Sequence, residues 1–102
     1  MFIFTIVAKP KPDNNESKEL GGAYVNAYIN FKDEEGAEVI ARYYIEDAGW
    51  YAEETDEVSW VFKGDLKKSE ERYQYFKEAK ASGSCLVFNT WPIDAEDVET
   101  KH

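Results

Sequence analysis

The alternation of residues in one short stretch limits how this chain can fold. In GGAYVNAYINF, residues 21–31, the odd positions from Ala23 onward are apolar, and the even positions are Tyr24, Asn26, Tyr28 and Asn30. Successive side chains of a β-strand point to opposite faces of a sheet. The stretch therefore predicts a strand with one buried apolar face and a second face of tyrosine and asparagine. That second face is the candidate functional surface of the predicted strand.

The other expected elements are strands and helices in mixed order. Residues 2–8 and 84–91 are rich in β-branched and aromatic side chains, which favours strands. Asp33 is a helix cap followed by an apolar stripe at helical spacing that ends at Gly49, so a first helix is expected there. A second helix is expected from a cap at Ser69 through Ser82.

Residues 50–62 allow two interpretations, one irregular strand or a hairpin that turns near residues 54–56. The hairpin is preferred, because the chain after its first loop then has the order β-α-β-β-α-β, which is the ferredoxin-like order. The expected fold class is therefore α+β. It is a two-layer, ferredoxin-like sandwich, with two helices packed on one face of a mostly antiparallel sheet of four or five strands.

The chain is expected to form a single domain over residues 1–102, because 102 residues are too few for two independent cores. Residues 93–102 are acidic and are expected to form a mobile tail. A competing expectation is that this tail folds back over the exposed sheet face, with Ile93 and Val98 as its apolar anchors.

Charge and composition restrict the partners and the compartment. The chain has 12 Lys and Arg against 21 Asp and Glu, a net charge of −9. Nucleic acids and anionic membranes bind proteins through basic side chains, so neither is expected as a partner. No apolar run reaches the roughly 18 residues of a membrane span. The single cysteine, Cys85, cannot form an internal disulfide, and the expected location is the cytoplasm.

No pattern of residues points to catalysis, to a metal or to a cofactor, so an enzyme is not the preferred interpretation. The only histidine is His102, and Cys85 in an apolar strand is expected to be a buried structural thiol. Residues 13–24 begin like a calcium loop but lack its glycine and glutamate. Residues 53–57, EETDE, are expected to be an exposed acidic turn; the alternative is a site for a cation or a basic partner.

The preferred hypothesis is a non-catalytic protein that acts through association, either with a second copy of itself as a dimer or with another protein. Tyrosine suits such a surface because its ring is apolar while its hydroxyl keeps a hydrogen bond, and asparagine offers both donors and acceptors. The expected binding surface consists of Tyr24, Asn26, Tyr28, Asn30, Trp60 and Trp91.

Two other functions stay open at this point. One is a small dimeric enzyme or ligand-binding protein, with a pocket between sheet and helices lined by Tyr28, Asn30, Trp60 and Trp91. A ligand-sized cavity with a desolvated carboxylate would favour it. The other is an acidic inhibitor, of the kind that neutralises a toxin, directed by its charge to a basic enzyme. Tight binding that weakens steeply with salt would favour that function.

Overall fold

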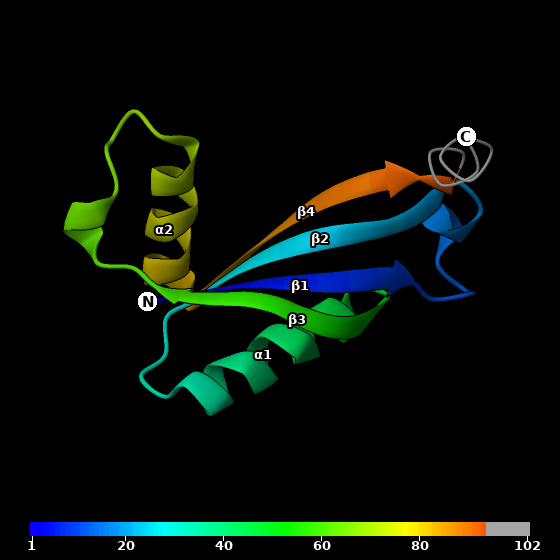
Figure 1. Ribbon diagram of the computed structural model, residues 1–102, viewed down its shortest axis with the longest axis horizontal. Coiled ribbons are helices and arrows are strands. Elements are labelled where there is room, and N and C mark those ends of the chain that lie inside the picture. The colour runs from blue at the N-terminus through cyan, green and yellow to red at the C-terminus, as the bar shows by residue number, and fades with distance from the viewer. Residues whose placement is uncertain (94–102) are drawn as a thin grey trace.

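The computed structural model describes residues 1–93 of the 102-residue chain. Its elements are β1 (Phe2–Pro10), the 3-10 turn η1 (Asn15–Lys18), β2 (Leu20–Ile29), α1 (Glu34–Asp47), β3 (Trp50–Trp60), the 3-10 turn η2 (Lys63–Asp65), α2 (Glu71–Ser82) and β4 (Ser84–Pro92). The strands form one antiparallel sheet in the order β3-β1-β2-β4, with α1 and α2 packed against it (Figure 1). The predicted α+β class is confirmed.

The segment expected to be a hairpin is a single irregular strand. β3 pairs with β1, and its register shifts twice, between the partners of Thr5 and Ile6 and again between those of Ile6 and Ala8. The hairpin prediction is wrong because the acidic residues 53–57, which resemble a turn in the sequence, lie in this bulged part of the strand with most of their side chains exposed. The ferredoxin-like order depended on that hairpin and is not confirmed.

One face of the sheet packs against α1 and forms the larger core. Phe4 and Ile6 of β1, Val25 and Ile29 of β2, and Ile45 of α1 are all fully buried in it. The strand residues lie at alternate positions, as the sequence pattern predicts. Burial of these side chains fixes the register of β1 against β2, because a shift by one residue would turn the whole apolar set to the other face.

The two ends of α1 are set by local sequence. The Asp33 carboxylate accepts a hydrogen bond of 2.8 Å from the backbone N–H of Gly36, and Glu34 and Glu35 lie in the first turn, where the helix dipole favours acidic side chains. Gly49, with φ of 94°, has the left-handed conformation that commonly follows a helix. The prediction of this helix is confirmed.

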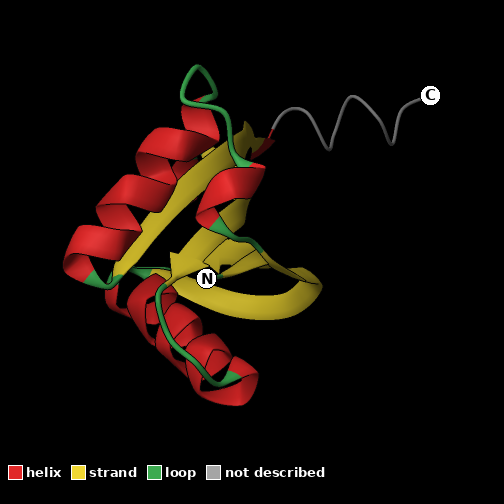
Figure 2. Cartoon of the chain, turned by 90° about the vertical axis from the view of Figure 1, so that its left-hand side faces the viewer, coloured by secondary structure: helices red, strands yellow, loops and turns green. Residues whose placement is uncertain are grey.

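α2 packs on the opposite face, so the expectation that both helices share one face is wrong. Its Phe76 and Ala79 are buried with Ile3, Tyr28 and Cys85, the strand residues that point away from α1. The physical reason is that the strands are apolar on both faces at this end of the sheet, so each face needs a cover. Figures 1 and 2 show α1 below the strands and α2 above them at one end.

The bounds of α2 differ from the prediction at its start. The helix begins at Glu71 after an N-cap at Glu70 whose side chain makes no capping hydrogen bond, so Ser69 is not the cap. It ends at Ser82, as predicted, before Gly83 with φ of 101°.

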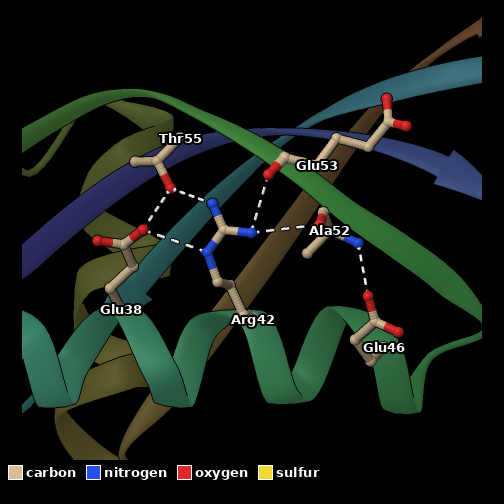
Figure 3. A network of polar contacts seen from close by, with 6 residues as sticks. All are labelled: Glu38, Arg42, Glu46, Ala52, Glu53 and Thr55. Atoms are coloured by element: carbon tan, nitrogen blue, oxygen red, sulfur yellow. Dashed lines mark hydrogen bonds and ion pairs between the residues drawn. The ribbon is translucent and has the colours of Figure 1, made fainter.

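A polar network centred on Arg42 ties α1 to the outer edge of β3 (Figure 3). The Arg42 guanidinium donates to the backbone carbonyl oxygens of Ala52 at 3.2 Å and Glu53 at 2.9 Å, and to the hydroxyl oxygen of Thr55 at 2.8 Å. It also donates to the Glu38 carboxylate at 3.2 Å, which accepts a second hydrogen bond from the Thr55 hydroxyl at 2.7 Å. The network links two turns of α1 to three residues of the strand edge.

Glu46, one turn further along α1, bonds another backbone group on the edge of β3. Its carboxylate accepts a 2.8 Å hydrogen bond from the backbone N–H of Ala52 and forms an ion pair of 3.1 Å with Lys11. The Thr55 hydroxyl, followed by Arg42, holds the pKa of Glu38 below its usual value, and the Ala52 N–H, followed by Lys11, does so for the pKa of Glu46. The edge groups of β3 are therefore bonded to ionised side chains.

We expect Arg42→Ala to lower the free energy of unfolding by about 2–3 kcal/mol, because it leaves Glu38 and two backbone carbonyl groups without their charged donor. Urea denaturation measures the change. Arg72→Ala is the matched control, since Arg72 is exposed on α2, and it should shift stability by less than about 0.5 kcal/mol. Equal losses in the two variants would contradict the role assigned to the network.

Candidate functional site

The part of the sheet that neither helix covers is the candidate site. On the face opposite α1, the helix α2 covers the end that carries Ile3 and Tyr28. The remainder, called here the open face, consists of Thr5, Val7 and Lys9 of β1, Tyr24 and Asn26 of β2, and Asn89 and Trp91 of β4. Tyr24 at its centre is 48% exposed.

A glycine in β2 allows Trp91 to lie across the sheet. A Cβ atom at Gly22 would come within 2.4 Å of the Trp91 ring and 3.0 Å of the backbone oxygen of Ala8, so no side chain fits there. The Trp91 ring lies 5.1 Å from the ring of Tyr24, and the ammonium group of Lys9 lies 5.3 Å from its centroid. One aromatic side chain of β4 thus reaches over β2 to a lysine of β1, in a cation–π contact.

The asparagines of the open face are only partly used by the fold. The Thr5 hydroxyl donates to the amide oxygen of Asn26 at 3.1 Å, and the amide nitrogen of Asn89 donates to the backbone oxygen of Tyr24 at 3.3 Å. Within residues 1–93, the amide nitrogen of Asn26 and the amide oxygen of Asn89 have no hydrogen bond. The face therefore offers one unused donor and one unused acceptor beside an exposed tyrosine.

Three residues of the predicted surface lie outside the open face. Tyr28 has the predicted orientation but is only 3% exposed, because α2 covers it and its ring lies 5.7 Å from that of Tyr75. Asn30 follows the end of β2 and donates its backbone N–H to Gly83. Trp60 lies on the α1 face of β3, with its ring 4.6 Å from that of Phe2. The structure brings together Tyr24, Asn26 and Trp91.

A polar cleft adjoins the open face where the sheet meets α2. Its volume is about 440 Å³, which is in the size range of ligand sites. Its polar lining includes Thr5, Asn26, Glu57, Glu71, Arg72, Tyr75 and Asn89. Sequence reasoning missed Glu57, Arg72 and Tyr75, because only the fold brings β3 and α2 to the same end of the sheet.

The acidic side chains that line this cleft lack the desolvation typical of a catalytic acid or base. The Tyr75 hydroxyl donates a 2.5 Å hydrogen bond to the Glu71 carboxylate, which raises the pKa of Tyr75. The side chains of Glu57 and Glu71 are both exposed. The cleft has the size expected for the ligand-binding alternative but not the desolvated carboxylate that would favour it.

The single cysteine is buried, as predicted. Cys85 is 9% exposed and donates a hydrogen bond of 3.1 Å from Sγ to the Glu78 carboxylate. Burial, followed by the hydrogen bond to Glu78, raises the pKa of the thiol to about 12. The reactive thiolate is therefore disfavoured at neutral pH.

The two predictions for the C-terminal tail, that residues 93–102 are mobile or that they fold back over the sheet face, fall mostly on residues outside the described part of the chain. Val98, one of its two proposed anchors, falls there. Ile93, the other, is described, and its backbone N–H donates to the carbonyl oxygen of Glu19 at 3.1 Å.

Comparison of the chain with protein-family models, with curated proteins and with solved structures gives no match. In the described part of the chain, neither α1 nor α2 has the length and apolar character of a membrane-spanning helix. Residues 1–93 also contain no group of three or more histidine, cysteine or acidic side chains arranged to hold a metal.

We expect Gly22→Ala to destabilise the protein by about 1–3 kcal/mol, because the added Cβ must displace the Trp91 ring or the backbone of β1. Thermal unfolding measures the loss, and a change in tryptophan fluorescence of the folded variant reports the displacement. Gly64→Ala serves as the control, because a Cβ there meets nothing within 4 Å. A neutral Gly22→Ala variant would show that the ring is not held as described.

Proposed function

We propose that this protein is non-catalytic and acts by association, using the open face to contact the surface of another protein chain. The single observation that carries the proposal is that α2 covers only one end of the second sheet face, which leaves Tyr24, packed beside the Trp91 ring, 48% exposed. A half-exposed tyrosine packed beside a partly buried tryptophan is the kind of surface that protein interfaces use.

The chemistry of the open face supports a protein partner. Tyr24 and Trp91 supply apolar area at a small cost in side-chain entropy, since the packing against Gly22 and Lys9 already orients them. The unused amide groups of Asn26 and Asn89 can bond to a partner's polar atoms. Such a centre of aromatic residues with neighbouring hydrogen-bonding groups matches the composition of stable interfaces.

Two observations support a non-catalytic role over the enzyme alternative. The Cys85 thiol has its pKa raised to about 12 and is bonded to Glu78, so it is a poor nucleophile. The acidic side chains of the polar cleft, Glu57 and Glu71, are exposed, so they lack the burial that raises the pKa of many catalytic carboxyl groups.

Charge and cysteine content support the rest of the proposal. A net charge of −9 disfavours nucleic acid and anionic membrane surfaces, which attract basic proteins. A single cysteine held as a thiol agrees with a reducing compartment, and we place the protein in the cytoplasm on that ground.

Site-specific photo-cross-linking in cells tests the proposal. Tyr24 is replaced by the photoreactive analogue p-benzoylphenylalanine, which preserves an aromatic ring at the centre of the open face. We expect light-dependent adducts to protein at this position, and the adduct mass identifies the partner: twice the chain mass means a second copy.

The matched control places the same photoreactive residue at Tyr43, which is 63% exposed on the outer side of α1. Position 43 should give only background adducts, although its exposure is higher. Equal and weak cross-linking at positions 24 and 43 would contradict the proposed function.

A further inference from the structure

We infer that β4 is a dimerisation edge, which pairs antiparallel with β4 of a second copy to make one sheet that runs through both chains. The inference goes beyond the proposed function, since it concerns the border of the sheet and not its open face. Either can fail while the other stands.

Within residues 1–93, the outer edge of β4 carries backbone groups over residues 85–90 that no helix or other strand bonds. Along a border strand, alternate N–H and C=O groups point away from the neighbouring strand. β4 pairs with β2 from Ser84 to Pro92 and is an outermost strand in the sheet order β3-β1-β2-β4, with no further strand beyond it in Figure 1. Within residues 1–93, no hydrogen bond from a helix or loop reaches the backbone of residues 85–90. This border is available for another strand.

The sequence of β4 does not protect it against such pairing. SCLVFNTWP contains no charged residue in nine positions, whereas natural border strands usually carry lysine, acidic residues or bulges. Its apolar side chains remain partly exposed on both faces: Leu86 and Phe88 on the α1 face and Val87 on the other. A strand added at this border would bury them further.

The opposite border of the sheet is protected in three ways. Residues 53–57 of β3 bring four carboxylates to it, and two register shifts distort the strand there. The side chains of Arg42 and Glu46 occupy backbone groups of Ala52 and Glu53 that would otherwise accept a strand. A second chain therefore has one border to bind, and it is β4.

Charge and symmetry favour a second copy as the occupant. Two chains of net charge −9 repel each other. Of the two edge strands, only β4 lacks charged side chains, so two copies can meet there without placing like charges opposite each other. A strand that pairs antiparallel with itself forms a two-fold interface, in which the same residues serve on both sides. Because the edge of β3 is protected against pairing with another strand, the assembly ends at a dimer and does not grow into a fibre.

The geometry also has a consequence for the open face. A two-fold axis perpendicular to the sheet keeps the same face upward in both copies. Because the two strands run antiparallel, Trp91 of one copy lies beside the Cys85 end of the other, which α2 covers, and the open faces meet only around Asn89. Asn89 and Trp91 of each chain then lie beside the shared border. The dimer would present twice the aromatic surface of one chain.

A charge-swap experiment at Asn89 tests the inference. Asn89 is exposed and lies near the middle of β4, so in a two-fold pair centred on that strand it comes close to Asn89 of the second copy. Sedimentation velocity over a range of concentrations measures the dimer. We expect Asn89→Lys alone and Asn89→Glu alone each to weaken dimerisation about tenfold or more, and an equimolar mixture to restore it to within about threefold of wild type.

Controls separate the interface from general effects of charge. Ser59→Lys and Ser59→Glu place the same charges on exposed β3 and should change dimerisation by no more than about twofold. Recovery in the mixed Asn89 sample shows that both variants are folded, because an unfolded chain could not pair.

Three results would overturn the inference. A wild-type chain that stays monomeric up to about 1 mM has no dimer of useful affinity. Asn89 variants that dimerise like wild type, alone and mixed, place the interface elsewhere. A dimer that Tyr24→Glu weakens joins the copies through the open face, to which the Asn89 side chain also belongs; the inference then fails and the proposed function stands.

Discussion

The pairing of β1 with β2 is the constraint on which the rest of the structure depends. Their register sets Phe4 opposite Ala27 and Ile6 opposite Val25, and these side chains can be buried only if a helix covers that face. The same register sends Tyr24 and its neighbours to the other side. Once α1 is in place, the second face needs cover only where it is apolar, around Ile3, and α2 supplies it there. The open face is therefore the part of this second sheet face that α2 does not reach.

Local features could be predicted from the sequence, and features that depend on register could not. The alternation around Val25 and the capping signals of α1 act within a few residues, so both were predictable. Trp60 was expected on the same surface as Tyr24, but its face follows from its pairing opposite Phe2, a long-range contact that no local pattern marks. Tyr28 was judged exposed because the face chosen by α2 depends on distant contacts with Phe76.

The two borders of the sheet differ in a way that matters for association. α1 does two things at once: its apolar stripe buries the core, and its Arg42 and Glu46 bond the border of β3. Within the described residues, no side chain of a helix bonds the backbone of residues 85–90 of β4. The edge strand β3 is bonded by side chains of α1, one face of the sheet packs against α1, and α2 covers part of the other face. The edge strand β4 and the adjoining open face remain for contact. This part of the sheet combines β4 with the Tyr24–Trp91 pair, and it is the basis on which we propose a role in association.

Hydrogen exchange of individual backbone amides, followed by NMR at a low and a high protein concentration, tests this account most directly. The amide of Ala52, which Glu46 binds at 2.8 Å, should be protected at both concentrations. The outward-facing amides of residues 85–90 should exchange quickly in dilute protein and become protected as the concentration rises. Fast exchange at Ala52, or β4 amides whose exchange does not depend on concentration, would contradict the account.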